Sequence, residues 1–450
     1  MAKASFLQKL AVTMCALTRS TDLAARWTGA TPFLPALFVL RYANMGGLDR
    51  ALFAEQIRAA RSFRDDRWCS YWNRTAEAQA NRATDLLRAL AGPNSADVAD
   101  LTDPSTPPVP LDGLTPWMAS AAALFADHGP QPDPCALAAI VDEYVPTEDR
   151  EPVTLAFSVI DAWVKAITYY QVSAFPGHDP QRLQAYWRSR HLFDRLVEVV
   201  VPALGLSVAH VDIPLAGGDA VRGYLVVPPG PGPHPVVLTT NGLEGTVQEL
   251  AIPQLRYRDS GMAMFVMEMP GSYAYTDSMR PESQAVYHQV IDYLASDERL
   301  DANRIAMVGV SFGAYWTARV AATSGRLNCA IACGAPTHRS FHGGALGTPQ
   351  IILHALARTV GAVHPIDLVK KLRALSIRDL YQDITIPLLV INGDHDTLMS
   401  TQDSRDLARA APNATLLLYP DDDHCAMGHY RQWLDYSQRW LLENLNAAVV

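Results

Sequence analysis

Apolar runs that alternate with helical segments constrain the fold of this chain more than any other feature. After residue 205 such runs occur at 235–242, 262–270, 305–311, 329–335, 387–393 and 415–420. Segments with helical periodicity separate most of them, at 284–295, 314–322, 404–410 and 430–445. Continuous apolar strands separated by helices are typical of a mostly parallel sheet with helices on both faces. Two further runs, 208–215 and 220–228, flank the turn residues AGGD and predict an antiparallel hairpin ahead of that sheet.

The chain before residue 205 follows a different pattern. Apolar residues recur there at helical spacing, at 52–63, 76–90, 118–126, 137–144 and 155–170. A proline-rich stretch at 103–116 interrupts this pattern, and a new helix is expected to begin at Pro180, directly after Asp179. We therefore expect a mainly helical domain over residues 1–205 and an α/β domain over residues 206–450.

The composition excludes several classes of protein. The chain has 450 residues, 37 basic and 46 acidic side chains, a formal net charge of −9 and 49% hydrophobic residues, which is typical of a globular protein. The basic residues form no stripe, so no nucleic-acid partner is expected. No apolar stretch reaches the roughly 20 residues that a membrane span needs. Six scattered cysteines indicate a reducing compartment, and the N-terminal run at 10–17 imitates a signal peptide only weakly, so a cytoplasmic location is expected.

The sequence Gly-Val-Ser-Phe-Gly at 309–313 is the motif with the clearest chemical meaning. It directly follows an apolar strand and directly precedes a helical segment, which is the context of a nucleophile elbow. A serine on such a sharp turn is presented at the start of a helix, where the helix dipole stabilises developing negative charge. The glycines leave room for the neighbouring strand and helix. Ser311 is therefore the candidate nucleophile.

A serine hydroxyl needs a histidine base and an acid that orients it, here in the chain order serine, acid, histidine. Asp396 follows the strand that ends near residue 393 and is the candidate acid, with Asp394 as the alternative. His424 follows the last predicted strand and is the candidate base, in preference to His429 beside the final helix. The acidic residues at 421–423 predict a raised pKa for His424.

His338 and His342 follow the strand at 329–335. They either line a pocket or are exposed to water. No spacing of histidine and cysteine residues typical of a metal site occurs, so no metal and no cofactor is expected.

Two backbone amides are expected to bind the oxyanion that forms during acyl transfer. Phe312 follows the nucleophile and supplies the first. Leu243, next to Gly242 in the loop after the strand at 235–242, is the candidate for the second. Glu244 and Glu249 either face the reacting carbonyl as acids or lie exposed at the start of a helix.

Several of these segments together resemble the α/β hydrolases related to FrsA. They are NGLEGTVQEL, MEMPGSYAYTD, GVSFG, RLNCAIACGAPTH, INGDHDTL and DDDHCAMGHY, and in the helical half AITYYQVSAFPGHDPQRLQAYWRSRHLF. The resemblance implies an α/β-hydrolase fold with a helical cap over its mouth, and a dimer. It places the catalytic serine, acid and base at Ser311, Asp396 and His424, and it implies either ester cleavage or hydrolysis of a C–C bond beside a ketone. A glutamate of the oxyanion loop acts in some members, and Gln248 and Glu249 lie in that neighbourhood here.

These observations predict a cofactor-independent serine hydrolase that acts on a small-molecule carbonyl substrate through an acyl-enzyme. A domain-sized cap favours an extended or aromatic substrate, such as a polyketide-derived ketone or ester. Aromatic residues of the helical half, Tyr170 among them, would shape the pocket, although packing explains most of them as well. Two alternatives stay open, namely an acyltransferase or cyclising thioesterase with the same three residues, and a binding or regulatory protein without activity.

Overall fold

A computed structural model describes residues 6–92, 114–131, 133–343 and 347–447 of the chain. The predicted proline-rich break at 103–116 lies outside these ranges up to residue 113. None of the helices in the described ranges combines the length and the hydrophobicity that crossing a bilayer requires.

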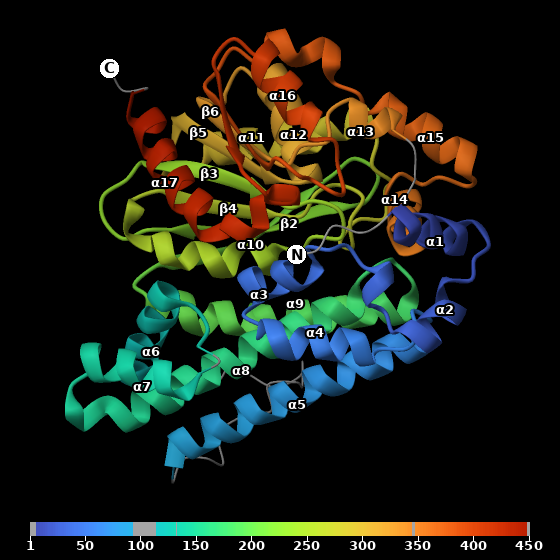
Figure 1. The fold of residues 1–450 in the computed structure, drawn as a ribbon. Coiled ribbons are helices and arrows are strands. Elements are labelled where there is room, and N and C mark those ends of the chain that lie inside the picture. The colour runs from blue at the N-terminus through green and yellow to red at the C-terminus, as the bar shows by residue number, and fades with distance from the viewer. Residues whose placement is uncertain (1–5, 93–113, 132, 344–346, 448–450) are drawn as a thin grey trace.

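The first half of the chain is helical, as predicted. Its helices are α1 (Phe6–Leu17), α2 (Thr21–Thr28), α3 (Phe38–Gly46), α4 (Arg50–Ala59), α5 (Asp65–Ala91), α6 (Thr115–His128), α7 (Pro134–Tyr144), α8 (Arg150–Ala174) and α9 (Pro180–Ala203). α9 begins at Pro180 because a first-turn residue needs no amide hydrogen. α8 is buried along most of its length between its neighbours. Figure 1 shows these helices as a layer below the sheet.

The second half forms one sheet of eight strands. They are β1 (Ser207–Pro214), β2 (Ala220–Val227), β3 (His234–Thr240), β4 (Ala263–Met267), β5 (Leu300–Val310), β6 (Cys329–Cys333), β7 (Leu388–Gly393) and β8 (Ala414–Tyr419), in the spatial order β1-β2-β4-β3-β5-β6-β7-β8. β1 and β2 form the predicted antiparallel hairpin, and β2 also runs antiparallel to β4. All other neighbours are parallel, which confirms the predicted mostly parallel sheet.

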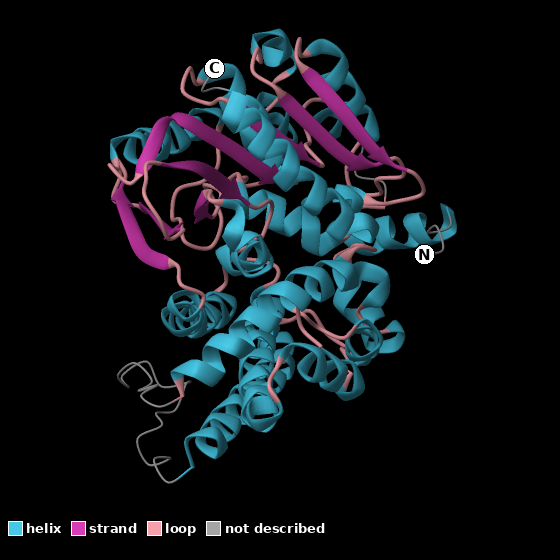
Figure 2. Ribbon diagram, turned by 90° about the vertical axis from the view of Figure 1, so that its left-hand side faces the viewer, coloured by secondary structure: helices cyan, strands magenta, loops and turns pink. Residues whose placement is uncertain are grey.

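Helices cover both faces of the sheet, because its strands are apolar on both sides. Val236 and Leu238 of β3 pack into the core under α11 (Gln284–Ser296), α12 (Phe312–Thr323) and α16 (Thr401–Ala410). Val237, between them, faces the opposite core with α10 (Val247–Gln254), α17 (Tyr430–Ala447) and the helical layer. Figure 2 shows the helical layer beneath the strands. The chain changes from helix to strand between Ala203 and Ser207.

Three helices between β6 and β7 were not predicted from the sequence. They are α13 (Arg339–His342), α14 (Gln350–Thr359) and α15 (Pro365–Ala374). α14 lies beside α1 in Figure 1. The amide of Gly347, just before α14, donates to the Thr13 hydroxyl of α1 at 2.8 Å. The N-terminal helix therefore contacts the second half of the chain.

Candidate active site

Ser311 occupies the turn between β5 and α12. Its backbone has φ of 59° and ψ of −122°, a conformation that is costly for a residue with a side chain. A Cβ atom added at Gly309 would lie 2.1 Å from the carbonyl oxygen of Gly313, and one added at Gly313 would lie 2.4 Å from that of Thr240. Both positions therefore require glycine, for the reason the sequence suggested.

His424 connects Ser311 and Asp396. Its Nε2 lies 2.8 Å from Ser311 Oγ, and its Nδ1 lies 2.7 Å from Asp396 Oδ2. The three residues follow β5, β7 and β8, whose carboxyl ends meet at one edge of the sheet. The side chain of His424 is 4% exposed and that of Asp396 is 0% exposed. The structure thus brings the three predicted residues into one buried chain of hydrogen bonds.

Asp396 is held by donors on both carboxylate oxygens. Oδ1 accepts from the amides of Leu398 at 2.9 Å and Met399 at 2.7 Å, and Oδ2 also accepts from Asn392 Nδ2 at 3.0 Å. Burial raises the pKa of Asp396, but His424 and these donors lower it by more, so the net shift is downward. The carboxylate therefore stays ionised beside the imidazole.

The pKa of His424 is raised well above its ordinary value, and the cause differs from the predicted one. Burial lowers this pKa, and the attraction of the Asp396 carboxylate outweighs it. The acidic loop was expected to raise it, but the carboxylates of Asp422 and Asp423 accept from backbone amides and do not contact the His424 imidazole. Asp422 accepts from the amides of Gly428 and His429, and Asp423 accepts from the His424 amide.

The loop after β3 lies directly against the serine. A Cβ atom at Gly242 would lie 2.6 Å from Ser311 Cβ, so only glycine permits this approach. Within the part of the chain that the structure describes, the amides of Leu243 and Phe312 donate to no acceptor. Both residues line the cavity in front of the serine. Two amides are therefore available there for a substrate oxygen.

A cavity of about 1170 Å³ opens over Ser311 and His424. Its walls come from α1, α3, α14 and α15 together with the loops after β3, β6 and β7. Apolar side chains predominate in the walls, including Leu37, Phe38, Met45, Phe175, Ile352, Leu356, Leu368 and Leu372. This volume accommodates a molecule considerably larger than an acetate ester.

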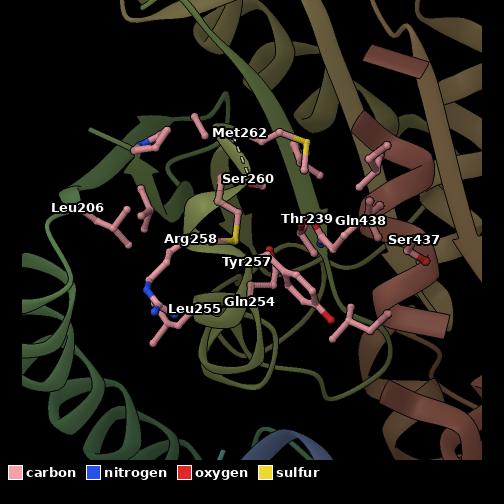
Figure 3. Close-up of a pocket in the computed structure, with 18 of the residues that line it drawn as sticks. Leu206, Thr239, Gln254, Leu255, Tyr257, Arg258, Ser260, Met262, Ser437 and Gln438 are labelled. Atoms are coloured by element: carbon pink, nitrogen blue, oxygen red, sulfur yellow. Dashed lines mark hydrogen bonds between the residues drawn. The ribbon is translucent and has the colours of Figure 1, made fainter. Parts of the chain in front are cut away.

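A second cavity lies under α17, far smaller than the first. Figure 3 shows Tyr257, Gln254 and Ser437 around it. Its volume is about 40 Å³, which is enough for water but not for an organic substrate. None of the predicted site residues lines it.

Glu249 does not face the cavity, contrary to one of the two predictions for it. Its carboxylate accepts from Arg41 of α3, with Nε to Oε1 at 2.7 Å and Nη2 to Oε2 at 2.8 Å. Oε2 also accepts from Asn241 Nδ2 at 3.2 Å and from the Thr246 amide at 3.0 Å. The second prediction, an exposed glutamate, is also wrong, because the side chain is 1% exposed. Glu249 is buried and paired within the protein.

Glu244 is likewise turned away from the cavity. Its Oε2 accepts from the Gly177 amide at 2.9 Å, and its carbonyl oxygen accepts from Arg41 Nη2 at 2.8 Å. Gln248 donates to the Ser189 hydroxyl at 3.1 Å and is buried as well. The predicted substrate contact of Glu244 is wrong, because the helical layer supplies its partners.

Tyr170 is not a cavity residue either. It lies in α8, is 3% exposed, and its ring packs under the Arg188 guanidinium at 5.9 Å. The prediction that it contacts substrate is wrong, because α8 is packed between α5 and α9 and its side chains fill that interface.

The alternative candidates lie away from the serine. The Asp394 carboxylate accepts from the Asp421 amide and contacts His395. His429 Nδ1 lies 2.8 Å from Asp422 Oδ2. His338 Nδ1 lies 2.8 Å from Ser376 Oγ, and His342 is exposed; neither lines the cavity.

Two residues that hold the loops of the site in place, Arg41 and Asp403, were not predicted from the sequence. Arg41 lines the cavity and also binds the loop after β3. Asp403 of α16 accepts from four consecutive amides, those of Thr337, His338, Arg339 and Ser340, and so fixes the segment after β6. Nothing in the sequence around Arg41 or Asp403 signals these long-range partners.

Comparison with known proteins relates this chain to esterases. The family model described as "Esterase FrsA-like" matches residues 152–446. The esterase FrsA of Enterobacter sp. (strain 638) is 25% identical over 204 residues, which cover 44% of this chain and 49% of that protein. The 2,6-dihydropseudooxynicotine hydrolase of Paenarthrobacter nicotinovorans is 26% identical over 263 residues, which cover 57% of this chain and 68% of that protein. The match thus spans about half the length of the Enterobacter esterase.

Solved structures support the same fold. A 2,6-dihydroxy-pseudo-oxynicotine hydrolase aligns with a TM-score of 0.57 at 21% identity, over 74% of this chain and 96% of that chain. AbyA5 aligns with a TM-score of 0.55 at 22% identity, over 70% of this chain and 91% of that chain. The predicted α/β-hydrolase fold preceded by a helical region is therefore confirmed.

Proposed function

Because the chain belongs to the FrsA-like esterase family, we propose that this hydrolase cleaves its carbonyl substrate through an acyl-enzyme formed on Ser311. The pair of hydrogen bonds at His424, 2.8 Å to Ser311 and 2.7 Å to Asp396, carries this proposal. A buried imidazole between a hydroxyl and a carboxylate is arranged to remove the hydroxyl proton. The proposed steps use only protein side chains, backbone amides and water.

The first half-reaction forms the acyl-enzyme. Ser311 Oγ attacks the carbonyl carbon while its proton passes to His424 Nε2, and the Asp396 carboxylate stabilises the imidazolium. The oxyanion binds the amides of Leu243 and Phe312. The leaving group departs with the proton that His424 returns. In the second half, His424 deprotonates a water molecule that attacks the acyl carbon, and the acid is released as Ser311 regains its proton.

The cavity supports an extended or aromatic substrate. Its volume of about 1170 Å³ and its apolar walls suit a large acyl or leaving group, such as a polyketide-derived ester. Ester cleavage is the simpler mode here, because the described lining offers no carboxylic acid as an additional proton donor. Cleavage of a C–C bond beside a ketone would depend on His424 alone for the proton that the leaving carbon needs.

A substrate panel tests this proposal. The purified chain is assayed with 4-nitrophenyl esters of increasing acyl length and with aryl 1,3-diketones, in the presence and absence of alcohols and amines. We expect hydrolysis of the longer esters, and its loss in Ser311→Ala. Transfer of most of the acyl group to an added alcohol or amine would instead indicate an acyltransferase. Activity that persists in Ser311→Ala would overturn the proposal.

We also expect a cytoplasmic homodimer with no nucleic-acid partner, as the resemblance and the composition imply. Light scattering coupled to size-exclusion chromatography measures the oligomeric state directly. A mass of one chain would contradict the expected dimer.

A further inference from the structure

The described residues that line the cavity over Ser311 include positively charged side chains and no negatively charged ones. Among the described residues that line it are Lys9, Arg19, Arg41 and Arg373, and none is Asp or Glu. The chain as a whole has 46 acidic and 37 basic residues, so an average surface of this size would hold several carboxylates. The charge of the cavity is thus opposite to that of the molecule.

Three of these cations have no acidic partner in the part of the chain that the structure describes. Lys9 of α1, Arg19 after α1 and Arg373 of α15 are exposed at the mouth, and none forms an ion pair with a described residue. The carboxylate of Asp367, on α15, accepts from the Val363 amide at 3.1 Å and forms an ion pair with Lys371. The charge at the mouth is therefore not cancelled by its neighbours.

We propose that the substrate is an apolar carbonyl compound that carries an anionic group remote from the bond that is cleaved. This inference rests on the proposed function. The apolar walls bind the carbon skeleton, and the cations at the mouth attract the anionic end. A carboxylate, a phosphate or an ionised enol would each satisfy this requirement. The positive charge at the mouth also favours the approach of an anion, against the repulsion from a protein whose net charge is −9.

The test compares two substrates that differ in one charge. Mono-4-nitrophenyl adipate carries a free carboxylate, and its methyl ester is neutral with the same leaving group. The ratio of their kcat/KM values, corrected for alkaline hydrolysis, is measured at low and high salt. We expect the anionic ester to be preferred roughly tenfold at low salt, with the preference falling as salt screens the charge.

Charge-neutral variants locate the effect. One protein combines Lys9→Gln, Arg19→Gln and Arg373→Gln, and it should lose most of the preference for the anionic ester. The matched control is a triple Gln variant at three other exposed arginines, Arg67, Arg405 and Arg439. They have no ion pair with a described residue and do not line the cavity. Equal kcat/KM values for the two esters, or a preference that survives in the first variant, would overturn the substrate class. If the proposed function itself were wrong, neither ester would be cleaved in a Ser311-dependent way, so the two failures can be told apart.

A separate observation concerns the loop that carries Leu243. The helical half of the chain holds this loop at several points. Arg41 of α3 bridges Glu249 and the Glu244 carbonyl, and Gln171 of α8 donates to the Thr246 hydroxyl at 2.8 Å. The Glu244 backbone has a φ of 56°, which is strained for a residue with a side chain. Such a conformation persists only where its surroundings enforce it.

We propose that Arg41 is a positioning residue that keeps the Leu243 amide aimed at the oxyanion. Glu249 transmits the constraint, since its Oε2 binds Asn241 Nδ2, and Asn241 Oδ1 in turn accepts from the Gly242 amide at 2.8 Å. The helical region is then part of the catalytic apparatus as well as a wall of the cavity.

Glu249→Gln tests this role more cleanly than a change of Arg41, because Glu249 does not line the cavity. The variant should lower kcat and the rate of phosphonylation of Ser311 by roughly tenfold or more, with KM nearly unchanged.

Arg41→Lys should retain part of the activity that Arg41→Ala loses. Asp161→Asn breaks the buried Asp161–Lys165 pair within α8 and is the stability control. A Glu249→Gln protein with a lower melting temperature but wild-type kcat would overturn the proposal.

Discussion

At the residue scale, the three proposed catalytic residues were predictable because topology fixes their order. Ser311, Asp396 and His424 each follow a strand of the parallel sheet, and parallel strands end at one edge. The direction of a side chain is not predictable in this way. Glu249 was expected either near the substrate or in solvent, and it binds Arg41, whose position is 208 residues away in the sequence. Long-range ion pairs leave no local pattern.

The pH dependence of the reaction follows from the His424–Asp396 pair. His424 accepts a proton only when neutral, so kcat/KM should rise with pH through its pKa. The Asp396 carboxylate raises that pKa above the ordinary value of 6.5, so the rise should be centred above pH 6.5. Asp396→Asn removes the attraction and should move the midpoint to lower pH, while the plateau falls by roughly 10⁴-fold. A pH–rate profile measures both effects, and a midpoint that moves upward in the variant would contradict the proposed pairing.

At the scale of elements, the strands were easier to predict than the helices that cover them. β3, β4, β6 and β7 are mostly apolar runs, and so is the second half of β5, from Ile305 onwards. α15 was not predicted, although Ile366, Val369 and Leu372 recur in it at helical spacing, and none of its residues is fully buried. α14 was not predicted either, and residues of both helices line the cavity.

Asp403 should be essential to the segment that follows β6. It is fully buried, and its carboxylate binds four amides and the Ser340 hydroxyl, while Ser340 and Phe341 line the cavity. Asp403→Ala leaves these buried donors without an acceptor and should lower the free energy of unfolding by about 3 kcal/mol. Denaturant titration measures the loss. Asp406, on the same helix, pairs with the exposed Arg339, so Asp406→Asn should change stability little. Equal effects of the two changes would contradict the anchoring role.

At the scale of the whole molecule, the helical layer and one face of the sheet share a single core. Trp163 and Phe193 of the helical layer belong to the same cluster of buried residues as Val308 and Ile331 of the sheet. The sequence predicted two regions, but periodicity alone could not show that they are packed into one core.

This shared core predicts cooperative unfolding. Tryptophan fluorescence, which reports mainly on the helical half, and far-ultraviolet circular dichroism should give coincident denaturation curves. A chain truncated to residues 206–450 should fail to fold, because the sheet would expose the face that the helices cover. Two separate transitions, or a folded truncated chain, would contradict a shared core.

Labelling of Ser311 is the most direct test of the proposed mechanism. The purified protein is treated with a fluorophosphonate, and the adduct is located by peptide mass spectrometry, with Ser311→Ala and His424→Ala treated in parallel. We expect one adduct, on Ser311, that is absent from Ser311→Ala and forms far more slowly in His424→Ala. An unlabelled Ser311 in folded protein, or labelling that is unaffected by the loss of His424, would contradict the mechanism.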